Sequence, residues 1–281
     1  MEYNVSEDIQ LICNYLSFSY SKFASEIGVS EETISRIVSK QYKPSEELLD
    51  KIYGFVFDKG IKFNETKVEY YKKHRDIVLF HGSKDKIVGE LSLNHSRKNV
   101  DLGPGFYVGD NYAQSLDFVC QTTSGSIYVF DASYKDLKIL TLDVSLEWML
   151  YIAINRGKIE KYKDTKKYQE IVENFDSYDV IVAPIADNRM FSTIDDFVNS
   201  AVSSEQAVHA LKDLSLGKQI VFKTEKSLKH LKMLERLFVS KSEKEQAFEH
   251  KIQKINDADE YVSNAYQKYI RQGLYISEIF K

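Results

Sequence analysis

Apolar positions in the first sixty residues follow short helical periods. They recur at spacings of three and four between residues 7 and 57, which predicts several short amphipathic helices. Gly28 is expected to end one helix, because glycine adopts a positive φ without strain. Ser30 and Ser45, each followed by two glutamates, predict the first turns of later helices. The N-terminal segment is therefore predicted to be a small all-α module.

The pattern changes to short apolar runs beyond a connector at residues 59–75. Such short runs, bounded by polar or glycine-containing segments, are typical of strands. Between them, Asn111 is expected to open one helix, and residues 204–214 form another. The predicted strands are residues 76–80, 106–108, 126–131, 179–184 and 219–222. This mixture predicts an α+β fold.

The C-terminal part is predicted to be helical. Leu228, Leu231, Leu234 and Leu237 recur at intervals of three, and residues 261–281 are too apolar for a free tail, so we expect them to pack on the core or on a partner. The expected organisation is a helical module at 1–58, a connector at 59–75, a central domain at 76–235 and a helical extension at 236–281.

Composition narrows the classes of protein further. The net charge is −4, with 28% charged and 43% hydrophobic residues, which is typical of a globular chain rather than a strongly basic nucleic-acid binder. The two cysteines suit neither a disulfide framework nor a zinc site. The longest apolar run, residues 148–154, is far below the ~20 residues that span a membrane. No signal peptide is evident, so we expect a cytoplasmic protein without metal or membrane contact.

The helical module resembles the helix-turn-helix of phage-repressor-type DNA-binding domains. The resemblance rests on two short helices joined by Gly28-Val29-Ser30 and a further helix after Pro44. In that family the second helix enters the major groove. The resemblance implies DNA contacts from Thr33, Ser35, Arg36, Ser39, Lys40 and Lys43.

Charge argues against strong DNA binding by this module alone. Residues 1–60 hold six lysines and arginines against ten aspartates and glutamates, whereas duplex affinity depends on neutralising phosphates. The alternative is a helical bundle that mediates dimerisation or docks a partner.

The central domain carries the candidate chemistry. One predicted strand ends in His81-Gly82-Ser83, where a glycine allows close backbone approach and a hydroxyl follows. About twenty residues later, Asp101-Leu102-Gly103-Pro104-Gly105 precedes Phe106-Tyr107. Taken singly, each motif is more often a turn or ordinary packing. The chain lacks a G-x-G-x-x-G strand-to-helix fingerprint, so a Rossmann-type nucleotide site is not expected.

In this order the motifs resemble the His-Tyr branch of the ADP-ribosyltransferase fold, the branch of diphtheria toxin and the poly-ADP-ribose polymerases. The resemblance covers residues 77–235 and is nearest to uncharacterised bacterial domains met in toxin or phage-defence settings. It implies a split antiparallel β-sandwich with peripheral helices that binds NAD as a substrate, without a metal.

The resemblance also assigns roles to individual residues. His81 would bind the adenosine-side ribose, Gly82 the nicotinamide amide, and Tyr107 would stack on the nicotinamide ring. Tyr112 is the candidate for the opposite face of that ring, and Arg156 is a candidate to pair with a phosphate. Gly105, Phe106 and Asp187 are further candidates for NAD contacts, and Ser83 and Asn111 are weaker ones for ribose or phosphate. Arg156 has a competing interpretation as a helix-end arginine that bonds nearby carbonyls, and His209 is expected to be structural.

The position of the family's catalytic carboxylate is an amide in this chain. The strand that usually begins with this acid contains Gln219. An amide binds a ribose hydroxyl but supplies neither a base nor a full negative charge, so mono-transfer or NAD hydrolysis is favoured over chain elongation. Asp101, Asp187 and Glu205 are the carboxylates that are candidates to replace it.

Three functional hypotheses follow. The first is an ADP-ribosyltransferase that modifies a nucleic acid or a protein, as a toxin or phage-defence component whose helix-turn-helix module binds operator DNA, an antitoxin or a second copy. The second is a DNA-binding regulator that binds NAD or a related nucleotide without catalysis. The third is a non-catalytic interaction protein.

Overall fold

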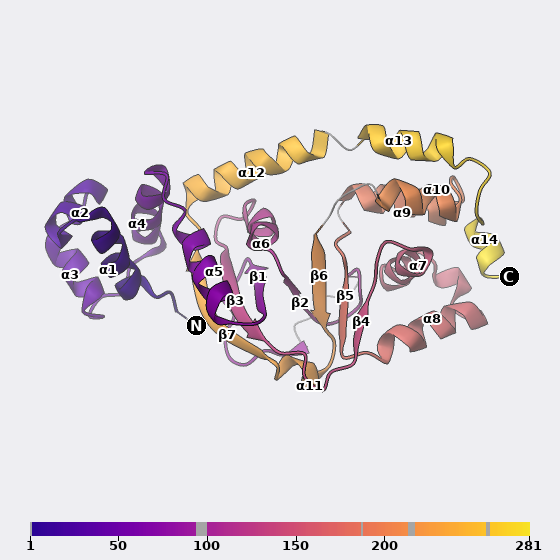
Figure 1. The fold of residues 1–281 in the computed structure, drawn as a ribbon, viewed down its shortest axis with the longest axis horizontal. Helices are drawn as coiled ribbons and strands as arrows, with labels where there is room; N and C mark the ends of the chain where they lie inside the picture. Colours follow the sequence, from indigo (N-terminus) through magenta and orange to yellow (C-terminus); the bar gives the residue numbers. More distant parts are fainter. Residues whose placement is uncertain (1, 94–99, 187, 213–216, 257–258) are drawn as a thin grey trace. The chain divides into compact units, whose positions relative to one another are not determined.

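The protein has an α+β fold in a computed structural model that describes residues 2–93, 100–186, 188–212, 217–256 and 259–281 (Figure 1). The chain divides into two compact units, each assembled from three segments. The first unit comprises Met1–Gly89, Asn111–Asp131 and Lys232–Lys251. The second comprises Glu90–Asp110, Ala132–Leu231 and Ile252–Lys281. No helix in the described ranges is both long and apolar enough to cross a membrane.

Four helices form the N-terminal module of the first unit. Their bounds are α1 Val5–Leu16, α2 Tyr20–Ile27, α3 Glu31–Val38 and α4 Glu46–Asp58. The predicted boundaries are confirmed: Gly28 ends α2 with a φ of 70°, and the hydroxyls of Ser30 and Ser45 accept backbone hydrogen bonds at the starts of α3 and α4. Ile9, Phe23, Ile34 and Ile52 fill the core between these helices.

The rest of the first unit is a sheet region with its own helical layer. It contains α5 Phe63–His74, β1 Val78–Ser83, α6 Tyr112–Val119, β3 Ser126–Ala132, β7 Leu231–Phe238 and α12 Lys241–Asn256. β3 lies between β1 and β7, and β1 is antiparallel to β3. The predicted connector at 59–75 is mostly helix α5, because Val68 joins Phe80, Ile127 and Leu237 in one buried cluster.

The segment around Leu234 corrects the prediction of a continuous helix. Only Glu225–Leu228 is helical (α11), and Leu231–Phe238 is strand β7. Leu231 and Leu237 are six positions apart, a spacing that suits both a three-residue and a two-residue repeat. In the structure the two-residue repeat holds: Glu235 and Leu237 are buried, whereas Arg236 between them is half-buried on the other face.

The second unit contains four neighbouring strands in the order β4-β5-β6-β2. β6 is antiparallel to β5 and β2, but β4 is parallel to β5, so the prediction of a purely antiparallel arrangement is wrong. The strands are β2 Phe106–Gly109, β4 Ile139–Thr141, β5 Val180–Pro184 and β6 Lys218–Phe222. The α-helices that complete this unit are α7 Leu146–Asn155, α8 Lys166–Asp176, α9 Asn188–Val198, α10 Ser204–Lys212, α13 Asp259–Lys268 and α14 Ile276–Ile279.

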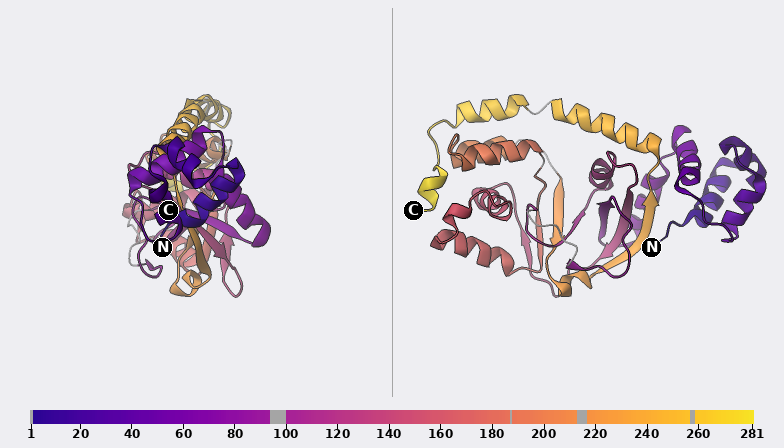
Figure 2. Two further views of the ribbon diagram at one scale, coloured as in Figure 1. Left: turned by 90° about the vertical axis from the view of Figure 1, so that its left-hand side faces the viewer. Right: turned by 180° about the vertical axis from the view of Figure 1, so that it is seen from behind.

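The second unit buries both its most apolar helix and the chain's C-terminal residues. Trp148 and its neighbours to Ala153 in α7 are almost wholly buried, which explains the longest apolar run of the sequence. α13 lies along α10 (Figure 2). Ile276 and Phe280 join the same core, with the Phe280 ring stacked on Tyr162 at 4.6 Å between centroids. The expectation that residues 261–281 pack on a core is therefore confirmed.

Candidate functional site

The glycine loop before β2 is shaped by two different constraints. Gly103 has a φ of +78°, where an L side chain is strained, and a Cβ there would lie 2.8 Å from Asn155 Oδ1. A Cβ on Gly105 would lie 2.4 Å from Val221 Cγ1, because β2 approaches β6 closely at this point. Both glycines are thus required by the packing of the second unit itself.

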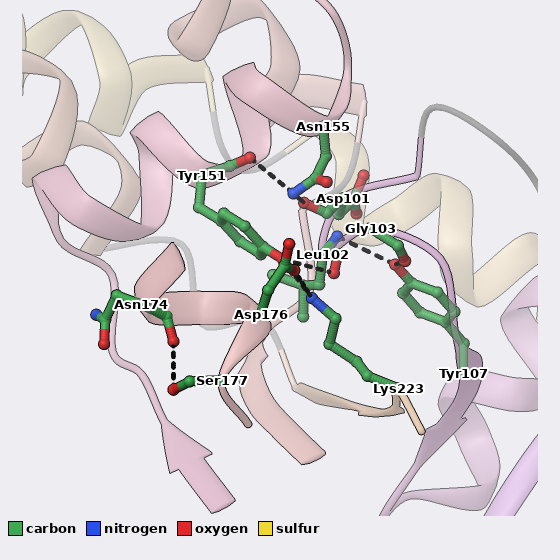
Figure 3. A network of polar contacts seen from close by, with 10 residues as sticks. All are labelled: Asp101, Leu102, Gly103, Tyr107, Tyr151, Asn155, Asn174, Asp176, Ser177 and Lys223. Carbon is green, nitrogen blue, oxygen red and sulfur yellow. Dashed lines mark hydrogen bonds and ion pairs between the residues drawn. The ribbon is translucent and has the colours of Figure 1, made fainter. Parts of the chain in front are cut away.

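Tyr107 closes this loop onto its own strand. Its hydroxyl accepts the Leu102 N–H at 3.0 Å and donates to the Gly103 carbonyl at 2.7 Å (Figure 3). Burial raises the pKa of Tyr107 well above its usual range. The phenol therefore stays protonated at neutral pH and fixes the loop, while its ring is half-buried beside the core.

Asp101 is the buried carboxylate of this site. Arg156 donates to its Oδ1 from Nε at 2.9 Å and from Nη2 at 2.5 Å. The guanidinium also lies 3.6 Å from the centroid of the Phe191 ring. Arg156 ends α7, yet its side chain holds a carboxylate rather than the nearby carbonyls of the structural interpretation.

Gln219 belongs to the same polar group. It lies in β6 opposite Gly109 of β2, and its Nε2 donates to the Pro184 carbonyl at 3.1 Å. Its side chain is also close enough to Asp101 to lower the pKa of that carboxyl. Burial raises the pKa of Asp101, although Arg156 and Gln219 act in the opposite direction. A carboxylate therefore lies beside the amide at the position where the sequence resemblance leads one to expect a catalytic acid.

A second chain of contacts supports the loop from the other side. Lys223 donates to the Tyr151 hydroxyl at 2.6 Å and to Asp176 at 2.9 Å, and Tyr151 in turn donates to the Leu102 carbonyl at 3.3 Å (Figure 3). Burial lowers the pKa of Lys223, but Tyr151 and Asp176 more than offset it, and the net shift is upward. Sequence reasoning missed Tyr151 and Asn155, since one tyrosine or asparagine in an apolar helix carries no distinguishing signal.

His81, Gly82 and Ser83 lie on β1 in the first unit. A Cβ on Gly82 would lie 2.7 Å from the Ser115 carbonyl oxygen and 3.1 Å from Val119 Cγ1, both in α6. Packing of α6 against β1 thus accounts for this glycine without a ligand. His81 and Ser83 are opposite Tyr128 and Ser126 of β3, on the other face of the sheet.

Two further candidates have structural roles in the first unit. Asn111 caps α6, its Oδ1 accepting the Ala113 N–H at 2.9 Å. Tyr112 is buried against Phe80 and donates to Glu243 at 2.7 Å. Protein encloses the Tyr112 ring, so it packs the core instead of making the predicted ligand contact.

Comparison with protein families gives one match. Residues 77–233 match a family described as "Protein of unknown function (DUF3990)". The chain belongs to this family. No curated protein and no solved structure matches the chain.

The DUF3990 region contains all of the predicted catalytic and NAD-binding residues, but the structure assembles only part of them in one unit. Arg156 and Gln219 meet through Asp101, next to the loop that Tyr107 closes, whereas His81 belongs to the first unit. Phe106 and Gly105 begin β2 beside this loop. Asp187 lies outside the described residues. Across the described part of the chain, no three His, Cys, Asp or Glu side chains are grouped as metal ligands would be.

The other candidate residues outside β-strands also have partners. Glu205 pairs with His209 at 3.4 Å on α10, and the His209 ring stacks on Tyr269 at 3.7 Å, as a structural histidine would. The structure describes two of the candidate carboxylates, Asp101 and Glu205, and Asp101 is the one that lies beside Gln219.

The predicted DNA-contact residues lie on or just after α3. Ser35, Arg36 and Ser39 are exposed, and the Thr33 hydroxyl shares a hydrogen bond with Ser30. Both lysines are already paired with acids of the same unit. Lys40 lies 2.8 Å from Glu7 and Lys43 lies 3.0 Å from Glu2. These pairs lower the positive potential that a DNA backbone requires.

Proposed function

We propose that this protein transfers single ADP-ribose groups from NAD to a macromolecular acceptor, a nucleic acid or a protein. The sequence resemblance supplies the reaction class. The observation that carries the proposal is the buried Asp101 carboxylate, which lies beside Gln219, the residue at the position where the resembled family has its acid.

The reaction needs negative charge close to the sugar. The bond between ribose C1′ and the nicotinamide nitrogen breaks, and its electron pair leaves with neutral nicotinamide. Positive charge develops on the ribose, and a preorganised carboxylate stabilises such charge. An oxygen or nitrogen of the acceptor then bonds to C1′, and its proton passes to a base.

Gln219 and Asp101 divide the role that one acid has in the resembled family. The Gln219 amide is suited to hold a ribose hydroxyl, and Asp101 supplies the carboxylate that stabilises charge and takes the proton. Arg156 keeps this buried carboxylate ionised and oriented. Tyr107, whose hydroxyl is engaged by the loop, presents only its ring for stacking on nicotinamide.

Nicotinamide release tests the proposal. The protein is incubated with NAD labelled in its adenylate half and a cell lysate, and both free nicotinamide and label transfer are measured. Asp101→Asn is expected to lower both signals by at least about a hundredfold, and Tyr107→Ala is expected to abolish them. Asp195→Asn, which alters a half-exposed carboxylate paired with Lys158, leaves them unchanged. His81→Ala tests whether the predicted ribose contact serves the same ligand. Equal release by the wild type and Asp101→Asn would refute the assigned role.

A second candidate function has one observation in its favour. Arg156 neutralises the charge of Asp101 in the structure, an arrangement that also suits binding of NAD without turnover. The protein would then be a nucleotide-sensing regulator that uses its helix-turn-helix module on DNA. Saturable NAD binding without nicotinamide release, together with a specific gel shift at physiological salt, would favour this function over transfer.

A further inference from the structure

The second face of the β1-β3-β7 sheet carries polar side chains beside the buried pair Leu79 and Phe130, in contrast to the apolar face that α5 and α6 cover. Phe80, Ile127 and Leu237 point to the helices and are buried. Residues directly opposite one another on paired strands share a face. His81 with Tyr128 and Ser83 with Ser126 therefore form the other face.

Arg236 of β7 lies on this second face. Its Nε donates to Ser126 Oγ at 2.9 Å, and its guanidinium carbon lies 4.1 Å from the Tyr3 ring centroid and 5.7 Å from that of Tyr128. The Tyr3 hydroxyl in turn shares a 2.8 Å hydrogen bond with Ser126. Two aromatic rings and a hydroxyl thus hold the guanidinium in one orientation.

The charge of Arg236 has no acidic partner in the described residues. No carboxylate oxygen of that part of the chain lies within 4.0 Å of it, whereas Arg75 of the same unit pairs with Asp131 at 3.5 Å and Arg156 pairs with Asp101. Glu235, its neighbour in β7, points to the opposite face and bonds to Lys67 and Tyr71. A fixed, half-buried guanidinium without a counter-charge is preorganised for an anion.

We infer that Arg236 is a phosphate-binding residue on the face of the sheet that carries His81. A planar guanidinium matches the oxygens of a phosphate, and immobilising it in advance lowers the entropy cost of binding. That this phosphate belongs to a nucleotide of the ADP-ribose type rests on the proposed function. Arg236 lies outside the residues that match the family, so neither the match nor the sequence motifs point to it.

Binding of three probes tests this inference with the full chain. ADP-ribose, inorganic pyrophosphate and adenosine are titrated by calorimetry into the wild type, Arg236→Gln, Arg236→Lys and the control Arg75→Gln. Hydrogen bonds to charged groups predict a tenfold to hundredfold loss of ADP-ribose affinity in Arg236→Gln, a smaller loss in Arg236→Lys and none in Arg75→Gln, at roughly tenfold per 1.4 kcal/mol. Adenosine binding is expected to be insensitive to Arg236.

The outcomes separate this inference from the proposed function. The inference about Arg236 is overturned if a folded Arg236→Gln variant binds ADP-ribose as tightly as the wild type. It is also overturned if the wild type binds none of the three probes. Arg236-dependent binding of pyrophosphate but not ADP-ribose assigns the site to free phosphate and overturns the nucleotide assignment. Arg236-dependent ADP-ribose binding without nicotinamide release supports the inference while refuting transfer. Thermal melts of each variant test whether unfolding causes a loss of affinity. Arg236→Lys keeps a cation beside the two aromatic rings and serves as the second variant.

Discussion

Each unit buries carboxylates against a cation, but the two sites are built differently. In the first unit, Lys67 lies between Asp8 and Glu235, with Lys67 Nζ 2.5 Å from Asp8 Oδ1. Tyr53 donates to Asp8 at 2.6 Å, and Tyr71 donates to Glu235 at 2.9 Å. One lysine therefore connects α1, α5 and β7 through a set of polar groups that satisfy one another.

The site of the second unit has one carboxylate, one arginine and an amide. Asp101 binds Arg156, and Gln219 links it to the ends of β5 and β6. The two acids that share Lys67 have a structural role, because they bond to protein groups that connect α1, α5 and β7. The Asp101 group instead adjoins a glycine loop at strand ends, where irregular backbone commonly carries function. The comparison predicts that stability depends most on the first group and chemistry on the second.

Lys67→Met is expected to have the largest effect on stability. The lysine side chain is 13% exposed, and its removal leaves two carboxylates buried without a counter-charge, at 5% and 1% exposure. Breaking such a group costs about 3–5 kcal/mol of the free energy of unfolding. Urea unfolding measures the loss, with Lys62→Met, which removes a 61%-exposed lysine, as the control expected to stay within ~0.5 kcal/mol. Equal urea midpoints for the two variants would show that Lys67 does not stabilise the contacts among α1, α5 and β7.

Exchanging acid and amide sharpens the assignment of the second group. Asp101→Asn is expected to lower nicotinamide release by about 10²–10³, the usual effect of losing one preorganised charge-stabilising group. The double variant Asp101→Asn/Gln219→Glu returns a carboxylate to the neighbouring position and is expected to regain at least about tenfold, which corresponds to ~1.4 kcal/mol of activation free energy. No recovery in a double variant that melts like Asp101→Asn would mean that the carboxylate is not the required group.

Local chemistry explains what the sequence predicted correctly. The ends of α2, α3 and α4 depend on Gly28, Ser30 and Ser45, each of which acts within a few residues. Similarly, the apolar strands and the docked C-terminal residues follow from hydrophobicity that must be buried.

Contacts between residues that are distant in the sequence could not be predicted from local patterns. Asp101 was one of three alternative acids, and only the fold brings it to Gln219, 118 positions away by residue number. Tyr112 satisfies every local criterion for a ligand-facing aromatic, yet its hydroxyl meets Glu243 of α12. β7 was assigned to the wrong element because a six-residue spacing fits both periods.

Glu243 provides a titration that is specific to the first unit. Burial raises its pKa to about 7, although Tyr112 and Asn64 donate to its carboxylate. The pKa is lower in the unfolded chain, so the native state binds the extra proton, and stability falls as the pH rises from about 4.5 to about 7. At about 1.4 kcal/mol per pKa unit the fall is on the order of 3–4 kcal/mol.

Glu243→Gln removes this titration and keeps the side-chain shape. The difference in unfolding free energy between wild type and variant is expected to decline between pH 5 and 7 and to level above 7. The same substitution at the exposed Glu69 of α5 provides the control. A flat difference for Glu243→Gln would show that protonation of Glu243 does not contribute to the stability of the contacts among α5, α6 and α12.

Tyr107→Phe separates the structural role of the Tyr107 hydroxyl from the proposed chemical role of its ring. The variant keeps the ring but loses the hydroxyl that bonds to Leu102 and Gly103, leaving the buried Leu102 N–H without that acceptor. The expected loss of stability is about 1–2 kcal/mol in urea unfolding, against no change for exposed Tyr42→Phe. Because stacking on nicotinamide needs only the ring, release is expected to fall less than about tenfold, whereas Tyr107→Ala abolishes it. If Phe and Ala reduce release equally while Phe melts like the wild type, the hydroxyl itself takes part in the reaction and the ring-stacking role is wrong.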